Sequence, residues 1–282
     1  MEKTKKARVI AFANQKGGVG KTMSVLNIGV GLVQRGYRVL LVDIDSQANL
    51  TMGCGFEPEE LEFTLSQLLE KCLANENKIT DFEKHILHTD EGIDLLPSDI
   101  NLQRMEGQIF ALPLGREFLI KRIIDDVKDR YDYILFDCPP SIGILTVNAL
   151  VAADQVIIPS QAQIFSAKGS TQLVENIQMV RQFFNVNLTI YGILFTMIDK
   201  RSKNARNMIK KIEEAYGMHI PVFNFYIPQS VRVGESNNEG ESIYKYDPKG
   251  RVAEAYRGCV EEIIDGIDED REPSWVKEIL NG

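Results

Sequence analysis

The chain has 282 residues, of which 44% are hydrophobic and 26% are charged, and its formal net charge is −8. That composition is typical of a globular protein, and no apolar run approaches the roughly 20 residues that a membrane-spanning helix requires. The negative net charge argues against a surface that binds nucleic acid as a whole, although it leaves room for a local basic patch.

The ends of the chain and its cysteines bear on where the protein works. The first residues, MEKTKKAR, are basic but lead directly into a strand-like run with no small-residue cleavage site, so we expect no secretory signal. Disulfide frameworks and zinc sites need closely paired cysteines, so wide spacing predicts reduced cysteines in a cytoplasmic protein. The spacing alone leaves open a metal cluster shared by two subunits. The four cysteines are Cys54, Cys72, Cys138 and Cys259.

Short β-branched runs alternate along the chain with longer segments of helical period. The predicted strands are, in chain order, 8–13, 38–45, 131–137, 155–160, 189–199 and 220–228. The predicted helices are 21–35, 115–129, 169–184, 203–217 and 249–265. Continuous apolar strands that alternate with helices indicate an α/β fold, with a mostly parallel twisted sheet and helices on both faces.

Two segments depart from this alternation. Residues 57–110 are more acidic and weakly periodic, with a helix expected in LSQLLEKCLANE and a short strand in GIDLLP. We interpret them as an elaboration at the edge of the sheet. The tail from Gly266 onward is acidic and then carries one short amphipathic turn. The expected organisation is a single domain over 1–282, with 266–282 as a C-terminal tail.

The stretch ANQKGGVGKT, residues 13–22, leaves a predicted strand and opens a predicted helix, which is the setting of a phosphate-binding loop. Backbone N–H groups from Gly17 to Thr22 and the positive end of the helix can surround a polyphosphate. Lys21 would reach the β- and γ-phosphates, and the Thr22 hydroxyl would ligate Mg²⁺. The alternative is a glycine-rich turn that only starts a helix. The usual first glycine of such a loop is replaced by Gln15.

Carboxylates end two of the predicted strands. Asp137 closes YDYILFD, where an apolar strand has no structural need of it, and it suits a metal ligand opposite Thr22. In DIDSQ, Asp43 and Asp45 alternate across the tip of the predicted strand 38–45, where they could orient a water or a magnesium shell. The alternative for this pair is a strand-terminating turn with a helix cap.

Together these pieces resemble the ParA/Soj family of partition ATPases, within the group of P-loop NTPases that has a deviant Walker A loop, KGGxGK[ST]. The resemblance covers nearly the whole chain. Besides ANQKGGVGKT, the motifs that carry it are VLLVDID followed by Gln47, Asn49 and Thr51, then YDYILFDCPPS, the VIIPSQ run, TMIDKRS, IPQSVRVGES and YDPKGRVAEAY, all in family order.

The resemblance implies a slow, switch-type ATP hydrolase, in which two subunits enclose two ATP molecules with Mg²⁺. Lys16 matches the signature lysine, which contacts the phosphates of the partner subunit and stabilises the transferred phosphoryl group. Asp45 matches the carboxylate that positions the attacking water, and Asp137 matches the Walker B carboxylate. The expected catalytic residues are Lys16, Lys21 and Asp45. The expected metal site is Thr22, Asp45 and Asp137. The expected nucleotide contacts are Lys16, Gly17, Gly18, Val19, Gly20, Lys21, Thr22, Met23, Pro228 and Ser230.

The same resemblance implies an ATP-dependent homodimer that binds double-stranded DNA without sequence preference, associates with the nucleoid and is stimulated by a ParB-type centromere-binding protein. Arg201 and Arg232 match positions that family members use to hold DNA. They lie in two basic runs, and the expected DNA contacts are Arg201, Arg232, Lys249 and Arg251. Only seven residues precede the first predicted strand, so we expect no N-terminal helix-turn-helix and no sequence-specific recognition.

The sequence departs from the family pattern at several positions. Met23 replaces a threonine after Thr22, Ser46 replaces a proline after Asp45, and Gln229 replaces an arginine after Pro228. The loop after Arg232 also carries Glu239 and Glu241, which add negative charge beside a predicted DNA contact.

Two other functions share the loop. A membrane-surface ATPase of the MinD kind needs a basic amphipathic C-terminal helix, whereas this tail, IDEDREPSWVKEILNG, is short and largely acidic, so we expect no stable membrane anchor. A metabolic or redox relative, such as a dethiobiotin synthetase or an iron–sulfur carrier, would need a small-molecule pocket or paired cysteines. The TMIDKRS and IPQSVR segments favour the partition ATPase.

Overall fold

The computed structural model describes residues 7–74, 81–161, 167–199 and 220–266. Its strands are β1 (Arg8–Phe12), β2 (Val39–Asp43), β3 (Leu87–His88), β4 (Asp94–Leu96), β5 (Tyr133–Asp137), β6 (Gln155–Ser160) and β7 (Thr189–Phe195). Its helices are α1 (Lys21–Gln34), α2 (Asn49–Gly53), α3 (Leu65–Leu73), α4 (Asn101–Phe110), α5 (Leu119–Asp125), α6 (Ile144–Ala152), α7 (Ala167–Phe183), α9 (Val231–Asn238), α10 (Ile243–Tyr246) and α11 (Arg251–Asp265).

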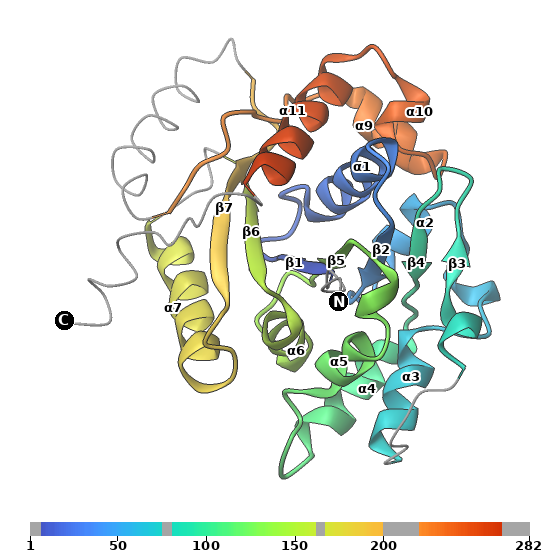
Figure 1. Cartoon of the computed structure of the whole chain (residues 1–282), viewed down its shortest axis with the longest axis vertical. Coiled ribbons are helices and arrows are strands. Elements are labelled where there is room, and N and C mark those ends of the chain that lie inside the picture. Colours follow the sequence, from blue (N-terminus) through green and yellow to red (C-terminus); the bar gives the residue numbers. More distant parts are fainter. Residues whose placement is uncertain (1–6, 75–80, 162–166, 200–219, 267–282) are drawn as a thin grey trace, which may run out of the picture.

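The strands form one seven-stranded sheet in the order β3-β4-β2-β5-β1-β6-β7, in which only β3 runs antiparallel to its neighbour. Helices α1 and α11 cover one face, and α3 to α7 cover the other (Figure 1). This confirms the predicted α/β fold. Because the chain leaves β1 toward β2 over one face and later passes from β5 to β6 over the other, β1 lies where the two directions of winding meet.

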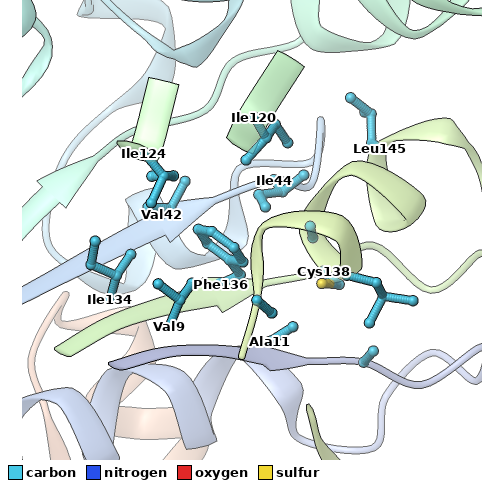
Figure 2. Close-up of a cluster of buried hydrophobic side chains, with 14 of the residues drawn as sticks. Val9, Ala11, Val42, Ile44, Ile120, Ile124, Ile134, Phe136, Cys138 and Leu145 are labelled. Carbon is cyan, nitrogen blue, oxygen red and sulfur yellow. The ribbon is translucent and has the colours of Figure 1, made fainter. Parts of the chain in front are cut away.

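Successive side chains of the central strands point to opposite faces of the sheet, and both faces are buried under helices. In β5, Ile134 and Phe136 point to the face covered by α5 and α6, whereas Tyr133 and Leu135 point to the face covered by α1 and α11. Figure 2 shows the first of these faces, where Phe136 lies among side chains of β1 and β2 and below Ile120 and Ile124 of α5. Strands buried on both faces need apolar residues at every position, which is why their sequences read as continuous runs.

The edge elaboration is part of the same sheet. Within 57–110, the helix predicted in LSQLLEKCLANE is α3, which begins at a capping box formed by Thr64 and Gln67. The predicted strand in GIDLLP is β4, which pairs with β2 in parallel register. Strand β3 then closes the edge. The prediction of a single domain over 1–282 includes residues outside the described ranges and stays a prediction.

The predicted strand at 220–228 is wrong as a strand. These residues, all of them described, form no continuous ladder with β7 and are joined to this part of the sheet by isolated bridges, Ile193 with Val222 and Ile198 with Pro228. The N–H of Ile227 also donates to the carbonyl of Phe195 at 2.8 Å. Between the two bridges the backbone leaves β7, because the carboxylate of Glu262 on α11 accepts hydrogen bonds from the N–H groups of Asn224 (3.0 Å) and Phe225 (3.1 Å). A side-chain acceptor thus replaces the strand neighbour for these two donors.

Several helices differ from the predicted ones. The helix expected at 115–129 is shorter, since α5 ends at Asp125 and a 3₁₀ turn at Lys128–Arg130 follows. Helices α2, α4, α6, α9 and α10 were not predicted. The helix expected at 203–217 lies outside the described residues. In the part of the chain that the structure describes, no helix combines the length and the apolar character that crossing a bilayer would take.

Candidate nucleotide-binding site

The predicted phosphate loop lies at the carboxyl edge of the sheet, directly after β1. Asp43 ends β2 and Asp137 ends β5, the two strands on one side of β1, and the parallel register places these two aspartates opposite each other. On the other side, β6 and β7 end at Ser160 and Phe195. Open parallel sheets bind ligands at this edge, where the winding reverses.

Side chains from the neighbouring strand ends fix the loop. The Thr196 hydroxyl donates to the carbonyl of Val19 at 2.7 Å, and the Gln161 amide donates to the carbonyl of Gly18 at 2.9 Å. Gly18 and Gly20 have φ of 70° and 77°, in the left-handed region that favours glycine. Helix α1 then begins with no side-chain cap. An uncapped helix start behind a glycine loop has N–H groups and a positive dipole end available to an anion.

Lys21 is the charged group at the base of the loop. Its side chain is buried, and its ammonium donates to the carbonyls of Asn14 and Lys16, both at 3.3 Å. Burial lowers its pKa, while the negative charge of Asp137 acts in the opposite direction. Two long hydrogen bonds to neutral carbonyls satisfy a buried ammonium poorly, so a phosphate oxygen would be a better partner.

Thr22 and Asp137 form the pair that the sequence predicted. The Thr22 hydroxyl donates to Oδ2 of Asp137 at 2.7 Å. The other oxygen, Oδ1, is buried and has no hydrogen-bond partner among the described residues. Burial, and after it the charge of Asp43, raises the pKa of Asp137 well above its usual value. A buried carboxylate oxygen without a partner, beside a threonine hydroxyl, is a donor set that suits Mg²⁺.

Asp43 and Asp45, which sequence reasoning placed together, occupy different environments. Asp43 is fully buried, accepts two hydrogen bonds from Thr51, and has its pKa raised by burial to about 7. Asp45 is half-buried and lines the pocket described below. Of the two, only Asp45 is placed to meet a ligand, and Asp43 serves the loop that carries it.

A pocket of about 500 Å³ opens above the loop. One wall is the loop itself with Asp45, and the opposite wall is the segment from Ile227 to Asn237. Of the predicted nucleotide contacts, the pocket is lined by Gly17, Gly18, Val19, Gly20, Lys21, Thr22, Met23, Pro228 and Ser230. Lys16 is exposed outside it, and Asp137 lies buried beneath it.

Sequence reasoning missed several residues of this pocket. Asn14 is not a lining residue but orders the start of the loop, since its side chain accepts from the N–H of Lys16 at 3.0 Å and donates to the carbonyl of Pro159 at 2.7 Å. Asn49, Thr196, Asn237 and Tyr256 do line the pocket. Asn49 begins α2, Thr196 follows β7, Asn237 is in the last turn of α9 and Tyr256 lies within α11. They meet at one pocket only because the topology brings these elements together.

The predicted DNA contacts lie apart from the pocket lining where they are described. Arg232 on α9 is exposed and its guanidinium is 3.2 Å from Glu235. Lys249 and Arg251 are exposed at the start of α11, and Figure 1 shows α9, α10 and α11 gathered at one end of the molecule. Arg201 lies outside the described residues.

Comparison with known proteins agrees with this geometry. A family model described as an AAA domain matches residues 7–190. The Bacillus subtilis sporulation initiation inhibitor protein Soj is 38% identical over 256 residues, which cover 91% of this chain and 98% of that protein. This chain belongs to the ParA/Soj family. The chromosome partitioning protein ParA of Caulobacter vibrioides is 35% identical over 91% of this chain and 94% of its own length.

A solved structure shares the fold of this ParA/Soj family member. The cobyrinic acid a,c-diamide synthase of Mycobacterium smegmatis, with bound ADP and magnesium, superposes with a TM-score of 0.79 at 33% identity, over 95% of this chain and 98% of the other. The family and the fold that the motifs predicted are therefore confirmed.

Proposed function

We propose that this chain is a DNA-segregation ATPase in which ATP binding drives sandwich dimerisation and DNA binding, and hydrolysis reverses both. Its cofactors are ATP and Mg²⁺. The observation that carries the proposal is the Thr22–Asp137 pair under a loop whose one buried ammonium, Lys21, faces only carbonyl oxygens. The name of the chromosome partitioning protein ParA, one of the relatives, supports the partition role.

In this proposal the residues of the pocket divide the binding of phosphates, metal, water and base among them. The loop amides from Gly17 to Thr22 and the Lys21 ammonium bind the phosphates, while Thr22 and Asp137 hold the metal. ATP supplies the phosphoryl group, and Mg²⁺ offsets the charge on its oxygens. Asp45, which lines the pocket, would orient the attacking water and would join Thr22 and Asp137 in holding the metal. Pro228 and Ser230 enclose the base, and the Ser230 hydroxyl also caps α9 by accepting from the N–H of Arg232 at 3.2 Å.

Lys16 has a task that a single subunit does not complete. Its side chain is exposed beside the pocket, although its backbone N–H is held by Asn14 at 3.0 Å. A cation that is held at its backbone and has an exposed side chain can reach the phosphates of a second subunit, where it would stabilise the developing charge. The homodimer, and its stimulation by a ParB-type protein at the nucleoid, belong to the same proposal.

The division of roles between Lys16 and Asp45 gives the first test. Lys16→Ala should bind ATP but fail to dimerise productively. Its rate of ATP hydrolysis should be about 10³-fold below that of the parent. Asp45→Ala should bind ATP, dimerise and stay dimeric, because it lacks only the carboxylate that orients water. Light scattering after ATP addition separates the two outcomes. If both variants stay monomeric, or both dimerise and dissociate like the parent, the assignment of these roles is wrong.

DNA binding is tested on Arg232. Neutralising phosphates releases counterions, so Arg232→Ala should weaken ATP-dependent DNA binding for every sequence and lower the slope of log affinity against log salt by about 1. Arg201→Ala should add to the effect. Arg38→Ala is the matched control, because its guanidinium is held by Asp132 at the opposite edge of the sheet. Gel-shift titrations that give the same affinity for the Arg232 variant, the control and the parent would reject the DNA-contact assignment.

One solved structure that shares this fold is a cobyrinic acid a,c-diamide synthase, and its activity is the second candidate. The two relatives named for sporulation inhibition and chromosome partitioning are more similar in sequence, at 38% and 35% against 33%. We therefore retain the partition ATPase. ATP hydrolysis that rises with added DNA, in the absence of any acid to amidate, distinguishes the two activities.

A further inference from the structure

The loop that carries Asp45 is held from both sides by one buried carboxylate. Oδ1 of Asp43 accepts from the N–H of Asp45 at 3.2 Å, at the start of the loop. Oδ2 accepts from the N–H of Thr51 at 2.9 Å, in α2 at the end of the loop. Between these points the chain turns through Ala48, whose φ of 51° is in the left-handed region. The position of Asp45 therefore depends on bonds that fix both ends of a tight turn.

Thr51 contributes more than its backbone. Its hydroxyl donates to Oδ2 of Asp43 at 2.8 Å and accepts from the N–H of Ser98 at 3.0 Å. Thr51, Asp43 and Ser98 are each 0% exposed. A hydroxyl is the side-chain group that can donate to a carboxylate and accept from an amide at the same point, so serine could replace threonine here but the isosteric valine could not.

Ser98 ties this turn to the edge elaboration. It follows β4, and the residue before it, Pro97, accepts from the N–H of Leu65 at the start of α3 at 2.9 Å. The residue after it, Asp99, is buried and accepts from the hydroxyl of Ser66. The junction between β4 and α4 is thus packed against α3 and bonded to Thr51, which makes the elaboration a support for the turn next to the pocket.

We propose that Thr51 is a positioning residue for Asp45, and that the edge elaboration braces the Asp45 loop through the hydrogen bond from Ser98 to Thr51. The inference rests on the proposed role of Asp45 in hydrolysis. It gives the segment 57–110 a task in the reaction: this segment determines how rigidly the water-orienting carboxylate is held, although it contributes no lining residue to the pocket.

The test compares Thr51→Val, which keeps the shape and removes the hydroxyl, with Thr51→Ser, which keeps the hydroxyl. Thr89→Val is the matched control, because the Thr89 hydroxyl also donates and accepts, at 3.2 and 3.1 Å, but with Ile93 in the β3–β4 turn. Thermal melts establish that each variant folds. Thr51→Ala, which also lacks the hydroxyl, takes the place of the valine variant if valine prevents folding.

Amide hydrogen exchange without nucleotide is the first measurement. In Thr51→Val the amides of residues 45–51 and Ser98 should exchange about tenfold faster or more, while those of 17–24 stay unchanged. Steady-state kinetics are the second. The valine variant should lose about tenfold in kcat with nucleotide affinity within about threefold of the parent, and serine should restore both.

Two results would overturn the proposal: parent-like exchange over 45–51 in the valine variant, or a serine variant as impaired as the valine variant. A parent protein that does not hydrolyse ATP would reject the proposed function instead. The exchange measurement then still shows whether Thr51 and Ser98 hold the Asp45 loop in place, because it needs neither nucleotide nor activity.

Discussion

Lys21→Ala is expected to lose ATP binding, with an affinity at least about 100-fold lower, which corresponds to about 2.7 kcal/mol. In the folded chain this ammonium is buried and donates hydrogen bonds to two carbonyl oxygens, both at 3.3 Å. Phosphate oxygens would replace these contacts by charge-assisted hydrogen bonds in a site that excludes water. Isothermal titration calorimetry with ATP and Mg²⁺ measures the loss.

Lys16→Ala is the matched control, because it removes an exposed lysine from the same loop. It should bind ATP with nearly the affinity of the parent. The melting temperature of Lys21→Ala without nucleotide should stay close to that of the parent, because the cost of burying the ammonium is removed together with its hydrogen bonds. Equal affinity of the Lys21 variant and the parent would reject the phosphate-loop interpretation.

Asp137→Asn is expected to stabilise the nucleotide-free protein and to remove its response to Mg²⁺. The buried Asp137 lies opposite the buried Asp43, and its Oδ1 has no partner among the described residues. Asparagine can still accept from Thr22 but carries no charge. We expect about 1–3 kcal/mol of added stability at pH 8, or roughly 3–8 °C in Tm. ATP with Mg²⁺ should raise the Tm of the parent and leave that of the variant nearly unchanged.

The gain should depend on pH in a defined direction. The pKa of Asp137 is raised in the folded state, so the folded chain favours the protonated form. Stability from this group is fully present below its unfolded pKa and is lost as pH rises through its folded pKa. The asparagine of the variant does not titrate, so the variant keeps its free energy of unfolding as pH rises while the parent loses part of its own. The stability difference in favour of the variant should therefore shrink as pH falls toward the pKa of Asp137 in the unfolded chain, and grow as pH rises.

Asp154→Asn is the control for this series. Burial also raises the pKa of Asp154, which accepts from the N–H of Val9 at 2.8 Å at the opposite edge of the sheet. This variant should keep the full Mg²⁺ response of the parent. A destabilised Asp137→Asn that still gains stability from ATP and Mg²⁺ would contradict the metal assignment.

The sequence predicted best where one physical cause acts alone. Strands buried on both faces need continuous apolar runs, so β1, β2, β5, β6 and β7 were found from their composition. The pattern failed at 220–228, because Glu262 lies 34 or more residues away and its competition for two backbone donors leaves no local signal. Helix α6 was missed because a helix that is apolar on nearly every side has no amphipathic period.

In the candidate site, too, the residues of one contiguous motif were predicted, whereas those that depend on the fold were not. The loop from Gly17 to Thr22 is contiguous, so its motif predicted which residues would lie together. The pattern of residues in DIDSQ gave both aspartates the same possible roles, and only the family resemblance singled out Asp45. In the structure Asp43 turns inward to Thr51 and Asp45 lines the pocket. That difference arises from the fold around Ser98 and α2. The contributions of Asn14 and Thr196 depend on the strand order, which no local pattern encodes.

The place of β1 between β5 and β6 has a consequence for synthesis on the ribosome. The phosphate loop is made before the two strands that flank β1, which begin only at Tyr133 and Gln155. The carbonyl of Pro159 and the side chain of Thr196, which hold the loop in shape, are made later still. A nascent chain therefore carries the complete nucleotide motif long before it has a nucleotide site. Pairings this distant in sequence form late and cooperatively. The full set of hydrogen bonds that hold the phosphate loop in shape can thus form only after Thr196 has been synthesised.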